Sequence, residues 1–510
     1  MKRAVALIAL ATVGCRTMEP AYVVPDASVP ASWPVGDSYL IGAEAGLPAL
    51  TYKQVFTDPR LQTLIAEGIA NNRNLRTAAA NVAAAREQFN IQRAQQLPTL
   101  NATGGATVTG DRGSSGSGSG SGSGNGSGSG SSGGGLSAQY QAGLSVPSYE
   151  IDLFGRLRSL SDVQLNRYFG TEAGARSTRL TLVADIANAW LDYAADASLL
   201  KIATETAASA AKSVRLTRLR LEGGIAPRTD LDQAGQIYDA AEADLARQRT
   251  AVAQDVNALR LLVGGPVDQS LLPVSIDEAF GTIAAVPAGL DSYVLLRRPD
   301  VIQAEYDLRA ANANIGAARA ALFPRITLTG LLGFASSALL KLLTGGAFGW
   351  SLGGDVNYTI FQGGAGHANV RLTEAQRNAA IATYQGTIQT AFREVSDALA
   401  RRGTINDEIA ARQRQQAETA DAYLLTEARY REGIDPFLTV LDAQRSYYAA
   451  QQTLVNTKLT AAQNIVTTYQ AIGGDVLLQG TPVCAPLPLD QGTPNAVLGR
   501  ECSPSLAPVG

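Results

Sequence analysis

The chain contains two copies of one unit, and this duplication limits its possible folds more than any other feature of the sequence. Asn74 aligns with Asp300, 226 residues later, and Pro98 aligns with Pro324 at the same spacing. Further landmarks recur in the same order at spacings of 207 and 209 residues: Leu153-Phe154 with Ile360-Phe361, Gly224-Ile225-Ala226-Pro227 with Gly433-Ile434-Asp435-Pro436, and Gly264 with Gly473. Such self-similarity indicates a repeated structural unit. We therefore expect the two halves to share one order of elements.

The first copy carries an insertion between Pro98 and Phe154, where the spacing of the landmarks falls from 226 to 207 residues. This interval contains an almost pure Gly/Ser tract, residues 113–135. A tract of this composition has too little apolar surface to fold, so it predicts a flexible loop. Because the tract lies inside a repeat, we expect it to join two strands and not two domains.

Apolar and polar residues alternate on both sides of this tract and again in the second copy. The apolar positions are Leu100, Ala102, Ala106, Val108, Leu136, Ala138, Tyr140, Ala142, Leu144 and Val146, then Ile326, Leu328, Leu332, Phe334, Phe348, Trp350, Leu352, Val356, Tyr358 and Ile360. A period of two predicts half-buried strands. We expect two hairpins, 99–150 and 325–361, which fit either a membrane barrel or a soluble sandwich. Four strands cannot close a barrel, since the smallest barrels need about eight; three chains would supply twelve.

Two proline-free segments, Leu157–Glu222 and Ala365–Glu432, are rich in alanine and leucine. Each would form a helix of about 66 residues, roughly 100 Å long. A returning helix follows each segment, with apolar residues at sevenfold spacing: Leu231, Tyr238, Leu245, Val252 and Leu259, then Val440, Tyr447, Leu454 and Ala461. A repeat of seven is typical of a coiled-coil seam. These helices suit an elongated assembly, although a free coiled-coil stalk has the same pattern.

The first residues predict export and a lipid anchor. Lys2 and Arg3 precede an apolar run, Ala4 to Gly14, that is shorter than the ~20 residues of a transmembrane helix. We interpret 1–14 as a signal peptide. The residues up to Cys15 resemble a bacterial lipobox, with Thr12 where leucine is usual, so Cys15 is the expected lipidation site of an anchored segment, 15–58. The alternative is a signal peptide that ends near an incidental cysteine.

Composition excludes several classes of protein. Lys+Arg (42) and Asp+Glu (45) nearly cancel, which argues against nucleic acid as a partner. With one histidine, His367, and three cysteines, the chain has little from which to build a catalytic triad or a metal cluster. We expect no enzyme activity, no cofactor and no metal site, and we assign His367 no role.

Four features of the chain carry a resemblance to a known family: the lipobox, the duplicated helix–hairpin–helix unit, Asp152-Leu153-Phe154-Gly155 at the strand-to-helix junction, and the paired Gly-Ile-x-Pro turns. Through them the chain resembles the outer-membrane efflux protein (outer membrane factor) family typified by TolC and OprM, in its lipoprotein branch. The resemblance runs from Cys15 to Gly474. It implies an α+β membrane protein that forms a homotrimer: a twelve-stranded β-barrel in the outer membrane, four strands from each chain, continued by a long periplasmic α-helical barrel with coiled-coil tips. The repeats would be 59–265 and 300–474, with a connection, 266–299, between them and a tail, 475–510, after them.

The resemblance also implies partners and sites. The partners are outer-membrane lipid, a periplasmic adaptor (membrane fusion) protein and an inner-membrane pump of the RND type. The adaptor-docking turns would contain Gly224, Ile225, Gly433 and Ile434. The periplasmic gate would contain Leu438, Asp442 and Arg445, with Asp230 tied to Tyr430 and Arg431. The chain departs from some members at Thr439 and Asp435, where they carry Asp and Arg, so one acidic ring is expected and not two.

The function implied is that of a passive outer-membrane channel of a tripartite efflux system, which exports small molecules such as drugs. One alternative is the outer-membrane conduit of a type I protein secretion system, and another is a lipid-anchored coiled-coil scaffold without a pore. In the tail, Cys484 and Cys502 would be the remaining thiols in an oxidising periplasm. They either form a disulfide or stay unpaired in a disordered tail.

Overall fold

A computed structural model of the chain describes residues 17–26, 29–30, 34, 51–110, 136–284, 292–343 and 346–474. The signal peptide, Cys15, the Gly/Ser tract, Cys484 and Cys502 therefore lie outside the described residues. α2 (Tyr52–Val55) precedes the first repeat. The elements of the first repeat are α3 (Pro59–Asn71), α4 (Arg73–Ala94), β1 (Asn101–Gly110), β2 (Leu136–Ile151), α5 (Arg156–Glu222) and α6 (Arg228–Val263). Those of the connection and the second repeat are η1 (Gln269–Leu271), α7 (Ile276–Phe280), η2 (Ser292–Arg297), α8 (Pro299–Ala320), β3 (Arg325–Ser336), η3 (Leu339–Lys341), β4 (Phe348–Asn357), α9 (Ala365–Arg431) and α10 (Phe437–Ala471).

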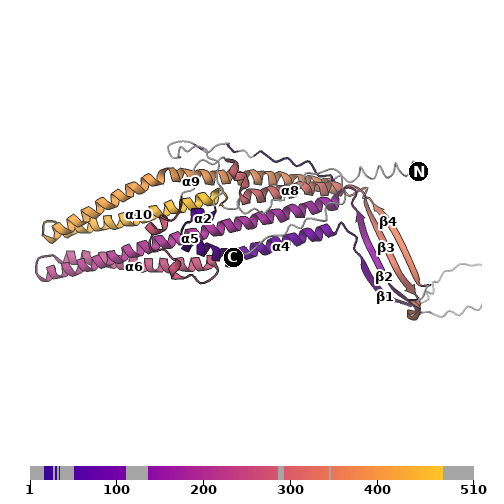
Figure 1. The fold of residues 1–510 in the computed structure, drawn as a ribbon, viewed down its shortest axis with the longest axis horizontal. Coiled ribbons are helices and arrows are strands. Elements are labelled where there is room, and N and C mark those ends of the chain that lie inside the picture. Colours follow the sequence, from indigo (N-terminus) through magenta and orange to yellow (C-terminus); the bar gives the residue numbers. More distant parts are fainter. Residues whose placement is uncertain are drawn as a thin grey trace, which may run out of the picture. The chain divides into compact units, whose positions relative to one another are not determined.

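The chain divides into two compact units, and each takes residues from both repeats. The first comprises the described residues within 1–23, 85–168 and 307–380, and the second those within 24–84, 169–306 and 381–510. Helix, strand pair and long helix follow one another in the same order in both repeats (Figure 1). The structure thus has the duplicated, helix-rich architecture that the sequence predicts, whereas its spatial units do not coincide with the repeats.

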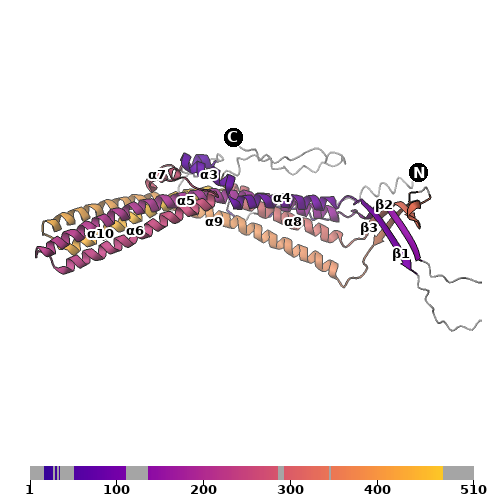
Figure 2. The ribbon, with the colours of Figure 1, turned by 90° about the horizontal axis from the view of Figure 1, so that it is seen from below.

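The first unit contains one antiparallel sheet in the order β1-β2-β3-β4, which Figure 2 shows as a single layer. Asn101 pairs with Ser145, and Arg325 pairs with Asn357. The register of β2 against β3 shifts between Val146 and Tyr149. Pro147 lies in this interval and has no N–H to donate to a neighbouring strand, which accounts for a bulge there. β4 ends at Asn357, so the predicted strand positions Tyr358 and Ile360 lie beyond it.

The start of α5 is fixed by a cap in the first unit. Asp152 accepts hydrogen bonds from the backbone N–H of Arg156 (2.6 Å) and of Arg158 (2.9 Å). Gly155 has a φ of 73°, which favours glycine. Glu150 forms a salt bridge with Arg156 at 2.7 Å. These contacts explain why the motif at 152–155 forms a sharp junction between a strand and a helix.

The extended segment 17–23 packs against this junction and against α8. Asn312, which is 3% exposed, donates from its Nδ2 to the Glu19 side chain (3.0 Å) and to the Pro20 carbonyl (2.9 Å). The Arg309 guanidinium lies 5.2 Å from the centre of the Tyr22 ring. Burial raises the pKa of the Glu19 carboxyl. The segment that follows Cys15 in the sequence is thus held by several specific contacts.

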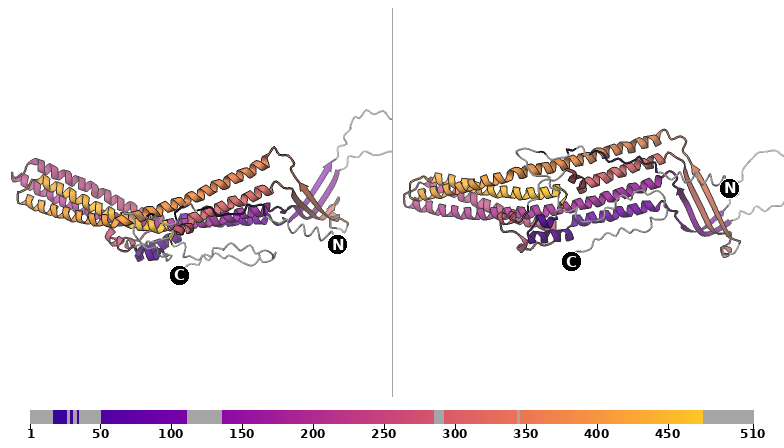
Figure 3. Two further views of the ribbon diagram at one scale, coloured as in Figure 1. Left: turned by 90° about the horizontal axis from the view of Figure 1, so that it is seen from above. Right: turned by 45° about the horizontal axis from the view of Figure 1, so that its top comes forward.

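The second unit contains two antiparallel helical hairpins, α5/α6 and α9/α10, which lie side by side (Figure 3). Ala203, Ala207 and Ala210 of α5 pack against Ala241 and Leu245 of α6 in one buried cluster. These small side chains let the two helices approach closely along the predicted seam. Trp190 of α5 is fully buried and donates from its Nε1 to the Leu271 carbonyl at 3.0 Å. No helix among the described residues is both long and apolar enough to cross a membrane.

Candidate functional site: the tips of the helical hairpins

Each hairpin ends in a turn of the same construction. Gly224 (φ 72°) follows α5, and Gly433 (φ 76°) follows α9. The N–H of Ile225 donates to the Arg220 carbonyl at 2.8 Å, and the N–H of Ile434 donates to the Arg429 carbonyl at 2.9 Å. A left-handed glycine with such a backward hydrogen bond is the usual way to end a helix. A proline then precedes the first residue of each returning helix.

The turns present apolar side chains and open space. Ile225 is 72% exposed and Ile434 is 62% exposed. A Cβ built on Gly224 or Gly433 would meet no described atom within 4 Å. The positive φ therefore accounts for both glycines within the chain, and the space beside them is accessible to another protein. The structure places the four predicted docking residues at these exposed tips.

An apolar cluster joins the two hairpins behind the turns. Tyr430 at the end of α9 and Phe437 at the start of α10 are 6% and 3% exposed, with ring centres 5.1 Å apart. The cluster also contains Ala234 of α6, together with Val440 and Leu441 of α10. The hydroxyl of Tyr430 is buried. Tyr430, predicted as part of a tie at the gate, is thus a core residue of the tips.

Charged side chains at the tips act on Tyr430. Burial raises the pKa of the Tyr430 phenol, the Arg220 charge opposes this rise, and the nearby Asp230 carboxylate adds to it. Arg431 forms a salt bridge with Glu427 in its own helix at 3.0 Å. Asp230 therefore lies near Tyr430, whereas Arg431 already has a carboxylate partner within the chain.

Leu438, Asp442 and Arg445 lie on one face of α10, because positions four and seven residues apart share a face of a helix. Leu438 is 59% exposed, and both charged residues are exposed. Asp442 and Arg445 form no ion pair with any described residue of the chain. The structure thus brings the three predicted gate residues together on a surface that this single chain leaves open.

Three carboxyl groups far from the turns lie close together, and the sequence did not predict this cluster. Asp192 and Asp196 of α5 lie near Asp255 of α6, and the Gln463 amide of α10 donates to Asp192 at 2.8 Å. Burial, and next the charge of Asp196, raise the pKa of Asp255 to about 7. The spacing of Asp192 and Asp196 indicates a shared helix face, but nothing in the sequence pairs them with a residue about 60 positions away.

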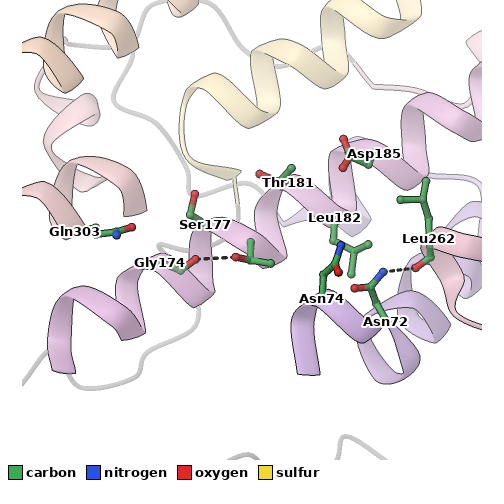
Figure 4. Close-up of a pocket in the computed structure, with 10 residues that line it drawn as sticks. Asn72, Asn74, Gly174, Ser177, Thr181, Leu182, Asp185, Leu262 and Gln303 are labelled. Carbon is green, nitrogen blue, oxygen red and sulfur yellow. Dashed lines mark hydrogen bonds between the residues drawn. The ribbon is translucent and has the colours of Figure 1, made fainter. Parts of the chain in front are cut away.

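A polar cavity of about 370 Å³ lies in the second unit, where the start of α4 meets α5 (Figure 4). Its walls are formed by Asn72, Asn74, Gly174, Ser177, Thr178, Thr181, Leu182, Asp185, Leu262 and Gln303. Asn72 donates to the Leu262 carbonyl at 2.7 Å, and Thr178 donates to the Gly174 carbonyl at 3.0 Å. Burial raises the pKa of the Asp185 carboxyl. The described residues contain no group of three or more His, Cys, Asp or Glu side chains suited to a metal ion.

The comparisons with known proteins agree over nearly the whole chain. The family model of the outer membrane efflux protein matches residues 64–265 and 291–474. The chain is 41% identical to the "Probable efflux pump outer membrane protein TtgC" of Pseudomonas putida, over 90% of this chain and 93% of that protein. It is 37% identical to the "Outer membrane protein OprJ" of Pseudomonas aeruginosa, over 92% and 95%. The solved open state of the Neisseria gonorrhoeae MtrE outer membrane channel is 32% identical, covers 90% of this chain and 99% of its own, and has a TM-score of 0.79.

Proposed function

Because the chain belongs to the outer membrane efflux protein family, we propose that it is the outer-membrane channel of a tripartite efflux system, a passive trimeric tunnel for small molecules. The observation that carries this proposal is the family match across both repeats, 64–265 and 291–474. In a system of this kind the energy comes from the pump, and the channel provides a path. Exposed hairpin tips and an amphipathic sheet suit that role.

The sheet supports the trimer. Among the described strands, β1 pairs only with β2, and β4 pairs only with β3. An open edge inside a membrane leaves backbone N–H and C=O groups without partners, which costs several kcal/mol for each group. Three sheets joined edge to edge would give twelve strands and remove every such edge.

The strand faces support a lipid environment for the sheet. Large apolar side chains on one face of β3 and β4 are exposed in the single chain: Leu332 by 47%, Trp350 by 72% and Leu352 by 72%. With Leu100, Leu144 and Val146 they line one shallow apolar groove. Lipid contact would cover this surface, and the polar residues that alternate with it would face water.

The hairpin tips carry the docking surface for the adaptor and the constriction of the tunnel. Exposed Gly224, Ile225, Gly433 and Ile434 form the surface on which the periplasmic adaptor docks, and an inner-membrane pump, of the RND type, completes the system. Leu438, Asp442 and Arg445 line the constriction of the tunnel. Under threefold symmetry one exposed Asp442 in each chain becomes three converging carboxylates, which repel one another unless Arg445 neutralises them.

The relatives' names favour small organic cargo over protein cargo. Curated relatives of 38–41% identity from Pseudomonas putida are named as outer membrane proteins of antibiotic, toluene and solvent efflux pumps. We assign cargo of this class to the chain, in preference to the type I secretion role. A scaffold without a pore would not require strands with one apolar and one polar face.

The proposal places the protein in the bacterial outer membrane, extending into the periplasm and anchored by lipid on Cys15. Thr17, two residues later in the sequence, lies against Gly155, four residues after the end of β2. The proposal also includes a disulfide between Cys484 and Cys502, which mass spectrometry of unreduced peptides tests.

Planar bilayers test the channel itself. We expect the purified full-length protein to add discrete conductance steps to a bilayer, because a closed barrel encloses a water-filled pore. Well-folded protein that binds the bilayer and adds no conductance, at any voltage, would contradict the channel and favour the scaffold. Export of a fluorescent dye from cells that also express the cognate adaptor and pump then tests the cargo class.

A further inference from the structure

The duplication places Arg220 and Arg429 at equivalent positions of the two hairpin tips. They are 209 residues apart, the same separation as Gly224 and Gly433. Each arginine also offers its carbonyl to the isoleucine N–H that closes its own turn. The two turns share one backbone construction, so a difference between these arginines comes from their side-chain surroundings.

Arg429 is bound within its own turn. Its Nε donates to Asp435 Oδ2 at 2.7 Å, and its Nη2 donates to Asp435 Oδ1 at 3.0 Å. Such a two-point pair fixes the planar guanidinium in place. The first turn has Ala226 at the position equivalent to Asp435. Arg220 therefore has no equivalent carboxylate in its own turn.

Arg220 instead crosses to the other hairpin. Its guanidinium lies 4.6 Å from the centre of the Tyr430 ring, and its Nη1 donates to the Tyr430 carbonyl at 3.0 Å. This carbonyl belongs to the last turn of α9 and also accepts the N–H of Gly433 at 2.9 Å. The helix dipole favours a positive charge at this end of the helix. The contact thus combines a charged hydrogen bond with a cation–π interaction.

Tyr430, which receives this contact, is held by packing. Tyr430 is nearly buried and packs against Phe437, the first residue of α10. The first hairpin has Leu221 at the position equivalent to Tyr430, so the crossing contact is made in one direction only. Leu438 and Asp442, the gate residues, follow Phe437 in the same helix. A contact that holds Tyr430 therefore also holds the start of the gate-bearing helix.

We propose that Arg220 is a positioning residue that latches the α5/α6 tip to the α9/α10 tip in the resting channel, and that opening breaks its contacts with Tyr430. The inference rests on the proposed gating function and adds to it the bond that opening must break. Other hydrogen bonds also join the hairpins further from the turns: Ser209 with Tyr423 at 3.1 Å, Tyr448 with Asp244 at 3.3 Å, and Gln463 with Asp192 at 2.8 Å. Ser209 lies eleven residues before Arg220 on α5, about 16 Å further from the turns. The contact of Arg220 therefore restrains the tips more directly.

Two substitutions remove the latch in different ways. Arg220→Gln removes the charge and the ring contact. Ala226→Asp leaves Arg220 in place and gives the first turn the carboxylate that Asp435 provides in the second, so Arg220 turns back to its own hairpin. We expect each variant to raise the resting open probability in planar bilayers by about tenfold, equivalent to ~1.4 kcal/mol. Ala226→Asp should add nothing further in the Arg220→Gln background.

The matched control is Arg218→Gln, which removes the same charge from an exposed position of the same helix. It should leave the resting open probability unchanged. The thermal dissociation of each detergent-solubilised assembly reports folding separately; if Arg220→Gln fails to assemble, Ala226→Asp carries the test. Wild-type resting behaviour in both assembled variants, with or without a loss of thermal stability, would overturn the latch. A wild-type protein without any conductance would instead overturn the proposed function.

Discussion

The Asp255 side chain makes the stability of this fold depend on pH. Its Oδ2 atom is buried, and Asp192 and Asp196 add negative charge on the facing helix. A pKa of about 7 means that the folded chain keeps a proton that the unfolded chain releases near pH 4. Between these values the native state binds more protons, so stability falls as pH rises from about 4 to about 7.

Asp255→Asn should therefore stabilise the protein more at pH 8 than at pH 5. The amide keeps the shape of the protonated carboxyl and removes the charge that burial and Asp196 disfavour. Thermal unfolding of the variant and of wild type at both pH values measures the difference. Asp239→Asn, an exposed position on the same helix, is the control and should shift both curves little. An equal gain at both pH values would show that Asp255 does not carry the pH dependence.

Asp442→Ala, and more so its combination with Arg445→Ala, should leave assembly intact and raise the resting conductance. Both side chains are exposed in the single chain, so their removal costs little folding energy. The expected effect comes from the converging copies, where the charged ring and its tie disappear. Conductance in planar bilayers measures it. Unchanged resting conductance in the double variant would remove both residues from the gate.

At the level of elements, substitutions at Gly433 can distinguish two reasons for a glycine in the turn: the backbone conformation and the approach of an adaptor. Gly433 has a positive φ, which asparagine tolerates far better than alanine. If the backbone alone requires glycine, Gly433→Asn should behave like wild type. If an adaptor also approaches the open space beside it, both Asn and Ala variants should lose dye export.

We expect the second result, with Gly433→Ala also less stable than Gly433→Asn by about 1 kcal/mol, because alanine is strained at this φ. Export in cells that express the adaptor and pump gives the first readout, and thermal unfolding gives the second. Full export by Gly433→Asn would confine the role of this glycine to ending the helix.

The elements that local patterns specify could be predicted from the sequence, and the contacts between distant elements could not. The proline-free segments and their terminal glycines predicted α5 and α9 within a residue at each end. The alternation continued past Asn357 and so predicted too long a β4, because a period of two does not show where pairing ends. The pairing of Arg220 with Tyr430 had no sequence signal, since a helix face reveals its own periodicity but not which residue of another hairpin it meets.

At the level of the whole molecule, four strands per chain set the number of chains. The sheet has two edges, β1 and β4, and each exposes a row of backbone groups that membrane lipid cannot satisfy. Closure by a single chain would need about twice as many strands. Two chains would supply eight, the lower limit, with an interior that side chains fill and no room for cargo. Three chains supply twelve, which closes the edges and leaves a pore.

We therefore expect the protein, extracted in mild detergent, to have the mass of three 53.2 kDa chains, less the processed signal peptide. Light scattering corrected for bound detergent, or native mass spectrometry, measures it. The assembly should also resist dissociation until the strands unfold, because separating the chains exposes two strand edges on each. A stable monomer or dimer that still conducts would contradict this account, since it would need an edge closed by some means other than a neighbouring chain.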